Sequence, residues 1–281
     1  MKSIAILGTG PAGLMAAYAC SIAGRPFSLF GFPSESGAVE PSEISGAQFV
    51  HEPIPGLMDS NNPSMEITYV KHGTEEGYAE KVYSSDPNVP FVSFSNVVDG
   101  EVQPAWDLRG YYRELWEGIA GEGSSVNAEI IDAMTLYEWT ETGQFDFIVS
   151  TIPRPAVCLA NLGIGTSPHP FLSQTVFVHS GEYANISENT IVYNGDKEPS
   201  WYRASNILGE ESTEWASERS VHPSFGSKVR KIGKPILHGC DCWSEDENVL
   251  FAGRYGKWQK GILVHDGFTT CASALMDRGY L

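Results

Sequence analysis

Three glycines near the start of the chain constrain its fold more than any other feature. Residues 3–7 (SIAIL) form an apolar run typical of a buried strand, residues 12–23 are rich in helix formers, and residues 25–30 (RPFSLF) predict a second strand. The glycines lie between the first strand and the helix, in the sequence GTGPAG. A G-x-G-x-x-G motif in this context is typical of a dinucleotide-binding β-α-β unit. The sequence therefore predicts an α/β, Rossmann-like fold that holds a pyrophosphate.

Each motif residue has its own expected role. Gly8 makes the tight turn, Gly10 lets the backbone approach the pyrophosphate, and Gly13 lets the helix pack closely on the strand. Pro11 and Ala12 lie between these glycines and open the helix, whose N-terminus favours phosphate charge. We expect all five residues to bind the cofactor. The alternative is a glycine-rich turn in an α/β protein without a ligand.

The end of the second strand departs from the usual dinucleotide-binding pattern. That position normally holds an acid that binds a ribose hydroxyl, and here it is Gly31. Glu35 lies four residues further on. We expect Glu35 to bind the ribose, with backbone groups as the alternative.

The charge of the chain limits the partners it can have. The net charge is −17 over 281 residues, so a uniformly basic surface for nucleic acid is excluded. One run is nevertheless basic and free of acids, and its members are Lys228, Arg230, Lys231 and Lys234. This run is either a solvated loop or a local site for a polyanion, such as a nucleotide pyrophosphate or a DNA backbone.

The cysteines indicate the compartment and raise the question of a metal. There are five, too scattered for a disulfide framework, at Cys20, Cys158, Cys240, Cys242 and Cys271. A reducing cytoplasm is therefore expected, and no apolar run reaches the length of a membrane span. His238, Cys240 and Cys242 suggest zinc, but the sequence offers no second pair of ligands, so we expect no metal.

Further elements follow along the chain. We expect strands at residues 65–73, 79–85 and 91–98, and the apolar spacing predicts a helix over 106–120. An apolar strand follows at 145–150. Near the end, Asp266 is placed to cap a final helix over 267–276.

Several motifs resemble one family when they are taken together. Residues 248–268 read NVLFAGRYGKWQKGILVHDGF, and an earlier Tyr202-Arg203 pair precedes them. The G-R-x-G-x-W loop with its later aspartate resembles UDP-galactopyranose mutases, especially the eukaryotic branch, within the wider group of amine-oxidase and protoporphyrinogen-oxidase flavoproteins. The GTGPAGL start, the GAQFVH segment and the T-x-P sequence at 151–153 occur in the order of that family.

The resemblance implies FAD as the cofactor and gives cofactor roles to particular residues. Gly253 and Arg254 would follow the pyrophosphate and the ribityl chain, and the helix at Asp266 would direct its N-terminus at the flavin. Gly46 and Gln48 would line the flavin ring.

The resemblance also implies substrate and catalytic roles. His51 would act beside the flavin, and the alternative is a hydrogen-bonded loop histidine. Arg203 would act on the substrate, with Tyr202 and Trp258 beside it, because a guanidinium pairs two phosphate oxygens at once. The alternative for Arg203 is a surface guanidinium stacked on aromatic rings.

These observations predict a Rossmann-like FAD-binding domain with a smaller inserted α+β substrate domain. The first would comprise residues 1–60, 105–165 and 235–281, and the second 61–104 and 166–234. The expected function is FAD-dependent oxidation of an amine, with C–N cleavage through an imine, on a nucleotide- or DNA-base-linked substrate. A mutase-like isomerase that uses reduced flavin and a non-catalytic flavin-fold protein are the alternatives. The cysteines indicate the cytoplasm. Compact mutase-like flavoproteins of this size resemble accessory enzymes, some of them virus-encoded, and for a viral protein the expected location is the cytoplasm of the host.

Overall fold

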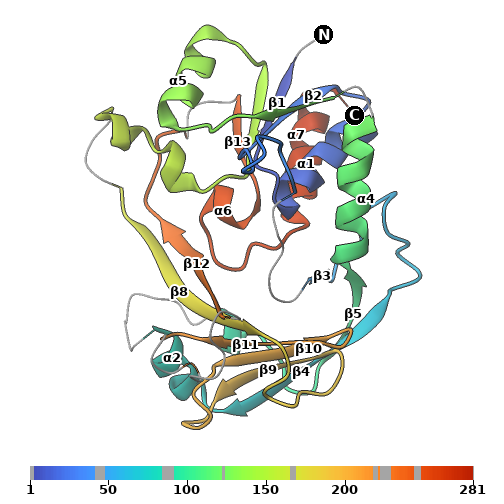
Figure 1. Ribbon diagram of the computed structural model, residues 1–281, viewed down its shortest axis with the longest axis vertical. Helices are drawn as coiled ribbons and strands as arrows, with labels where there is room; N and C mark the ends of the chain where they lie inside the picture. Colours follow the sequence, from blue (N-terminus) through green and yellow to red (C-terminus); the bar gives the residue numbers. More distant parts are fainter. Residues whose placement is uncertain are drawn as a thin grey trace. The chain divides into compact units, whose positions relative to one another are not determined.

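The computed structural model describes residues 3–41, 48–83, 92–121, 124–164, 169–217, 221, 229–243 and 248–280. The chain divides into two compact units (Figure 1). Unit 1 comprises Met1–Ile44, Arg109–Leu172 and Leu237–Leu281, and unit 2 comprises Ser45–Leu108 and Ser173–Ile236. Each unit is thus assembled from segments that lie far apart in the sequence.

Unit 1 is built on a five-stranded sheet with the order β13-β7-β1-β2-β6, and every pair of neighbouring strands is parallel. Its strands are β1 (Ile4–Leu7), β2 (Phe27–Gly31), β6 (Ser125–Ala128), β7 (Phe147–Ser150) and β13 (Val249–Phe251). The short apolar runs of β1 and β7 are fully buried, as expected for inner strands covered on both faces. The predicted α/β, Rossmann-like fold is confirmed.

Helices of unit 1 follow the predicted positions with small shifts at their ends. They are α1 (Pro11–Ile22), α4 (Leu108–Gly121), α5 (Ala133–Thr142), α6 (Gly253–Lys257) and α7 (Asp266–Asp277), with 3₁₀ turns η1 (Arg154–Val157) and η2 (Leu159–Leu162). The final helix begins at Asp266 and not after it, because His265 occupies the N-cap position. Asp266 therefore has its carboxylate available for contacts outside its own helix end.

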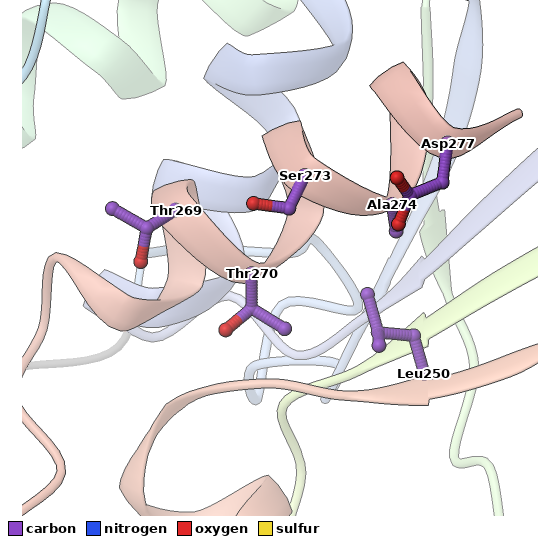
Figure 2. Close-up of a pocket in the computed structure, with 6 residues that line it drawn as sticks. All are labelled: Leu250, Thr269, Thr270, Ser273, Ala274 and Asp277. Carbon is purple, nitrogen blue, oxygen red and sulfur yellow. The ribbon is translucent and has the colours of Figure 1, made fainter. Parts of the chain in front are cut away.

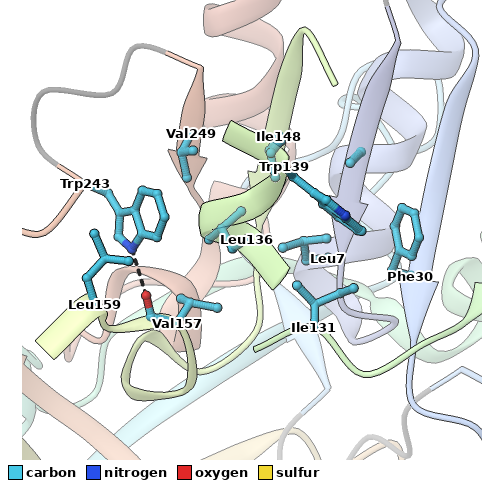
Figure 3. Packing of buried hydrophobic residues seen from close by; sticks show 11 residues of the cluster. Leu7, Phe30, Ile131, Leu136, Trp139, Ile148, Val157, Leu159, Trp243 and Val249 are labelled. Carbon is cyan, nitrogen blue, oxygen red and sulfur yellow. Dashed lines mark hydrogen bonds between the residues drawn. The ribbon is translucent and has the colours of Figure 1, made fainter. Parts of the chain in front are cut away.

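The core of unit 1 joins the sheet to α5 and to the loops beside β7 and β13. Phe30 and Trp139 pack with ring centroids 4.9 Å apart, and the Trp243 indole donates a 2.8 Å hydrogen bond to the carbonyl of Val157 (Figure 3). The second contact ties the segment after β7 to the segment before β13.

Unit 2 is built on an eight-stranded sheet with the order β12-β8-β11-β10-β9-β4-β5-β3. Its elements are β3 (Phe49–Val50), β4 (Met65–Gly73), α2 (Glu75–Tyr83), α3 (Val92–Ser95), β5 (Val102–Asp107), β8 (Phe171–Ser180), β9 (Thr190–Gly195), β10 (Arg203–Ile207), β11 (Glu210–Trp215) and β12 (Val229–His238). β4 and β9 are parallel, whereas β10 pairs with both of its neighbours in antiparallel fashion. This mixed sheet with short helices agrees with the α+β class predicted for the second domain.

Two predicted strands of unit 2 are wrong. Residues 79–83, expected as a strand, belong to α2, and residues 92–95 form α3. The buried positions of α2 are Tyr78, Ala79, Val82 and Tyr83, a spacing that lies on one helical face. The β-branched and aromatic residues there favoured a strand, but the acidic first turn at Glu75 and the packing of this face determine a helix.

The boundaries of the units also differ from the expected ones. Residues 48–60 lie in unit 2 and not in the cofactor domain, because β3 pairs with β5. Residues 169–172, expected in the substrate domain, lie in unit 1. Among the described residues, no helix is both long and apolar enough to cross a membrane.

Candidate functional site

The turn between β1 and α1 is shaped by its glycines. Gly8 has φ +107°, and its N–H donates a 2.8 Å hydrogen bond to Phe30. A Cβ atom on Gly13 would lie 1.9 Å from the Gly8 carbonyl oxygen, so only glycine permits this approach of helix to turn. A Cβ on Gly10, in contrast, would meet no protein atom within 4 Å. Protein atoms therefore fill the space beside Gly13, whereas no protein atom occupies the space beside Gly10.

The N-terminus of α1 is suited to an anion. Pro11 opens the helix, the N-cap Gly10 brings no side-chain capping bond, and the first turn contains no acid. The first amides of a helix have no acceptor within the helix, and the helix dipole adds partial positive charge there. The Tyr112 hydroxyl donates a 2.7 Å hydrogen bond to the carbonyl of Thr9, which fixes the turn beside this end.

The end of β2 explains why the usual acid is missing. A Cβ on Gly31 would lie 2.5 Å from Thr9 Cγ2 and 2.7 Å from Val39 Cγ1, so neighbouring side chains occupy the space of any larger residue. Glu35 lies in an exposed turn between the bridged residues Pro33 and Val39. Its role in ribose binding stays a prediction.

The loop that contains the G-R-x-G-x-W motif meets the same end of α1. Gly253 has φ +71°, and a Cβ there would lie 2.4 Å from the Cβ of Ala12. The Asp266 carboxylate accepts bonds from the backbone N–H of Gly253 at 2.8 Å and from the Lys257 ammonium at 2.6 Å. Unit 1 thus brings Gly253 to the start of α1, with Arg254 directly after it. The Asp266 carboxylate, at the start of α7, holds α6 against α7.

Trp258 has a fixed place in unit 1. It is the left-handed C-cap of α6, its indole N–H donates a 3.0 Å bond to the carbonyl of Leu172, and its ring meets Phe171 edge-on at 6.0 Å. These contacts orient the Trp258 side chain within unit 1. The substrate role of Trp258 stays a prediction.

His51 lies in unit 2, where both of its ring nitrogens have partners. Nδ1 is 2.7 Å from the carbonyl oxygen of Pro104, and Nε2 is 2.6 Å from the Tyr69 hydroxyl. Because a carbonyl only accepts, the proton belongs on Nδ1, and the Tyr69 hydroxyl donates to Nε2. Burial, with Tyr193 nearby, raises the pKa of Tyr69, so its phenol stays protonated.

Arg203 belongs to a buried cluster around Glu214. Arg203 and Lys234 both form ion pairs with the Glu214 carboxylate, and the Tyr202 hydroxyl donates a 2.9 Å bond to it. Burial would raise the pKa of Glu214, but the two cations and the hydrogen bonds from Lys234 and Tyr202 lower it to about 2. Two cations face one carboxylate, so the cluster has a net charge of +1.

Tyr69, Tyr193 and Arg203 lie on one face of the unit 2 sheet. In the sheet register Tyr193 pairs with Arg203 on one side and with Lys71 on the other, and paired residues share a face. Tyr69 lies two residues before Lys71 on β4, so its side chain is on the same face as that of Lys71. The rings of Tyr69 and Tyr193 are 6.5 Å apart. His51 reaches this face through its hydrogen bond to Tyr69. We call these four residues, His51, Tyr69, Tyr193 and Arg203, the aromatic face.

Other predicted residues receive less definition from the structure. Gly46 and Lys228 lie outside the described residues. Gln48 accepts a 2.9 Å backbone bond from Leu108 in unit 2. Arg230 and Lys231 are exposed and consecutive on β12, so they lie on opposite faces of that strand.

A shallow hollow of about 390 Å³ lies along α7 in unit 1 (Figure 2). Its lining residues are Leu250, Thr269, Thr270, Ser273, Ala274 and Asp277. None of the residues predicted for the cofactor or the substrate lines it, and we assign it no role.

Four residues that sequence reasoning did not combine come together in unit 1. The ligand-type atoms of Cys158, His169, Cys240 and Cys242 all lie within 4.8 Å of one another. The HGCDC motif was the available signal, but its partners lie more than 65 residues earlier in the chain.

No protein-family model matches this sequence, and no curated protein does. Solved structures do match. One is a flavoprotein/dehydrogenase from Cytophaga hutchinsonii, at 11% identity and a TM-score of 0.52 over 98% of this chain and 76% of that one. Another is the flavin-dependent halogenase Xcc4156 from Xanthomonas campestris, at 12% identity and a TM-score of 0.54 over 98% and 70%.

A third match is aklavinone-11 hydroxylase, solved with FAD and aklavinone, at 10% identity and a TM-score of 0.54. It covers 98% of this chain and 61% of the hydroxylase. These similarities extend to flavoproteins of several kinds, and they do not single out the amine oxidases or the mutases. The chain therefore resembles these flavin-dependent proteins in its fold.

Proposed function

We propose that unit 1 binds FAD noncovalently and that the protein is an oxidoreductase. The observation that carries this proposal is the glycine turn, closed toward the protein at Gly13 and open at Gly10, at an uncapped helix N-terminus. This is the arrangement that a pyrophosphate needs. The fold is also that of a hydroxylase solved with FAD.

The residues of unit 1 bind and orient this cofactor. The first amides of α1 donate to the pyrophosphate, and the guanidinium of Arg254 neutralises phosphate charge. Asp266 keeps α6 against α7 through the Gly253 amide and the Lys257 ammonium. Bound FAD supplies two-electron oxidation of an adjacent substrate carbon.

The aromatic face of unit 2 binds the substrate in this proposal. The net positive charge at Arg203, Lys234 and Glu214 favours a substrate with a carboxylate or a phosphate group. The Tyr69 hydroxyl, oriented by His51, offers lone pairs to a substrate N–H. Because the raised pKa of Tyr69 keeps the phenol protonated, it orients the substrate and does not act as a base.

We favour an amine as the oxidised group, on a nucleotide- or DNA-base-linked substrate, because the G-R-x-G-x-W loop and its aspartate resemble amine-oxidase-type flavoproteins. The carbon beside nitrogen is oxidised to an imine, and water then adds and breaks the C–N bond. The balanced reaction converts amine, O₂ and water into a carbonyl compound, ammonia or a smaller amine, and H₂O₂.

The first experiment tests the cofactor. The purified protein should be yellow and release FAD on heating, identified by mass and absorbance. Gly10→Val should lose FAD but keep its fold, because a Cβ at this position would meet no protein atom within 4 Å and would lie on the open side of the turn. A folded Gly10→Val protein that retains FAD would show that the pyrophosphate lies elsewhere.

The second experiment separates the reaction classes. Peroxide release from amine-bearing nucleotides or DNA in air, without a nicotinamide cofactor, would support amine oxidation. A requirement for NADPH with oxygen incorporation would indicate a hydroxylase instead. Isomerisation of UDP-galactopyranose after dithionite reduction would indicate the mutase alternative, and inactivity in all three assays would favour a non-catalytic flavoprotein.

A further inference from the structure

Unit 1 contains a cluster of three cysteines and one histidine outside the predicted cofactor site. Cys158 follows β7, at the junction of the two 3₁₀ turns, and His169 precedes β8. Cys240 and Cys242 follow β12, in the HGCDC motif. Cys158 is 1% exposed and Cys240 is 5% exposed, whereas the other two are half-buried. The cluster is thus largely enclosed by protein.

The distances within the cluster are those of ligands that share one ion. Cys158 Sγ lies 3.7 Å from Cys240 Sγ and 3.8 Å from Cys242 Sγ. Two thiolates bound to one tetrahedral Zn²⁺ at about 2.3 Å lie about 3.8 Å apart. Cys242 Sγ is 3.4 Å from His169 Nε2, and a thiolate and an imidazole on one Zn²⁺ lie about 3.6 Å apart. A disulfide would need about 2.05 Å, so the three sulfurs are separate thiols.

The orientation of His169 agrees with a role as a metal ligand. Its Nδ1 lies 3.1 Å from the carbonyl oxygen of Gly239, so Nδ1 carries the proton and Nε2 presents its lone pair to the cysteines. The Gly239 N–H donates a 3.0 Å bond to the carbonyl of Pro170. These two bonds fix the histidine segment against the cysteine segment without using any metal ligand atom.

Two further residues near the cluster, His238 and Asp241, could be considered as additional metal ligands. His238 is not a member of the cluster, and its Nδ1 accepts a 3.0 Å bond from the Cys240 N–H. The Asp241 carboxylate lies 3.8 Å from His169 Nε2, but the Asp241 side chain is 81% exposed to solvent. Three sulfurs and one nitrogen match in number and type the closed ligand set of a structural zinc site, which is tetrahedral.

We propose that Cys158, His169, Cys240 and Cys242 bind one structural Zn²⁺. The ion connects the segment after β7 to the segment before β13, and these two strands are neighbours in the parallel sheet. Trp243, next to Cys242, already bonds to Val157, next to Cys158, across the same junction. Zinc adds a second connection there and holds the edge of the sheet of unit 1.

The experiment measures metal content in the whole protein. After gel filtration in chelator-free buffer, mass spectrometry of the metals should give about one zinc per chain for the wild type. Cys240→Ser and His169→Ala should each lose most of that zinc. Cys271→Ser is the matched control, because Cys271 lies against Cys20 at 3.9 Å, away from the cluster, and it should keep the zinc.

A spectroscopic measurement covers the case in which the ligand variants do not fold. Wild-type protein stripped of zinc and loaded with Co²⁺ should show the visible ligand-field bands of a tetrahedral thiolate site, at longer wavelengths than flavin absorption. Wild-type protein with little zinc and no such bands would overturn the proposal. So would iron with inorganic sulfide in place of zinc, a Cys158–Cys240 disulfide found under reducing purification, or equal zinc loss in Cys271→Ser.

Discussion

At the scale of single residues, Glu214 binds and orients the polar side chains around it. Its carboxylate is almost fully buried, and three side chains are directed at it, those of Tyr202, Arg203 and Lys234. The sequence identified the Tyr202-Arg203 pair but not the acid, because Glu214 lies on the next strand and only the β10–β11 register brings it opposite Arg203. Arg203 is therefore both a candidate substrate residue and part of an internal ion pair.

Glu214→Gln should lower stability at neutral pH by about 3 kcal/mol, since the pKa of Glu214 falls from 4.5 to about 2 on folding. A carboxylate whose pKa is lowered on folding stabilises the folded state at pH values above its pKa in the unfolded state. This contribution to the free energy of unfolding disappears as the pH falls from 4.5 toward 2. Urea unfolding at several pH values should show the gap between wild type and variant closing over that range. Glu138→Gln, an exposed change on α5, is the control and should show little gap at any pH.

Arg203→Ala should leave the flavin spectrum unchanged and weaken substrate binding. Losing one charge-assisted contact costs about 1.5–3 kcal/mol, which raises the substrate Kd roughly 10- to 150-fold. Titration of the oxidised protein with substrate, followed by flavin absorbance, measures this effect. Loss of FAD with normal substrate affinity would instead assign Arg203 to the cofactor.

At the scale of elements, α1 is in close contact with two later helices of unit 1, α6 and α7. α6 and α7 both approach its first turn so closely that glycine is required, at Gly253 and at Gly267. A Cβ on Gly267 would lie 2.3 Å from the carbonyl oxygen of Ala12. The start of α1 is thus held by the close packing of α6 and α7, and it has no side-chain cap.

Gly267→Ala should therefore destabilise the protein, by about 1–3 kcal/mol for an overpacked contact. Gly118→Ala is the matched control, since Gly118 is an exposed position of α4 where a Cβ would meet nothing within 4 Å. That control should be stabilising by up to about 1 kcal/mol, because alanine is the better helix former. Thermal unfolding that gave the two changes the same sign would contradict this account of α7.

Helices and strands could be predicted from the sequence where residues close together in the chain determine the structure. The β-α-β unit and α4 follow from periodic apolar residues and from glycine placement. Residues 79–83 were misread because Tyr, Val and Ala fit either structure, and the buried face of α2 depends on partners in the sheet. The cysteine cluster was not predictable, because Cys158 and Cys240 are separated by 82 positions and only the parallel sheet brings them together.

At the scale of the whole molecule, the charge of −17 opposes any polyanion, so a DNA contact depends on local basic groups. The structure uses Lys234 internally, on Glu214, and places Arg230 and Lys231 on opposite faces of β12. A single DNA backbone passing one face of this strand would meet one of these two side chains. DNA binding through this run remains a proposal with few available contacts.

Replacing Arg230 and Lys231 by alanine together should therefore change the salt dependence of duplex DNA binding by about 0.9 slope units, the value for one phosphate contact. Fluorescence anisotropy with labelled DNA over a range of salt concentrations measures the slope. A change of about twice that size would mean that both residues contact phosphate. Absence of DNA binding by the wild type at low salt would leave a small free amine as the substrate.

The order in which the segments of unit 1 occur has a consequence for how the chain matures on the ribosome. The glycine turn and α1 are translated before both segments of unit 2, whereas β13 and α7, which packs on α1, are translated after them. Both segments of unit 2 leave the ribosome before these elements do. The nascent chain can therefore complete unit 2 before α7 packs on the first turn of α1, so unit 1 is the later of the two units to be completed.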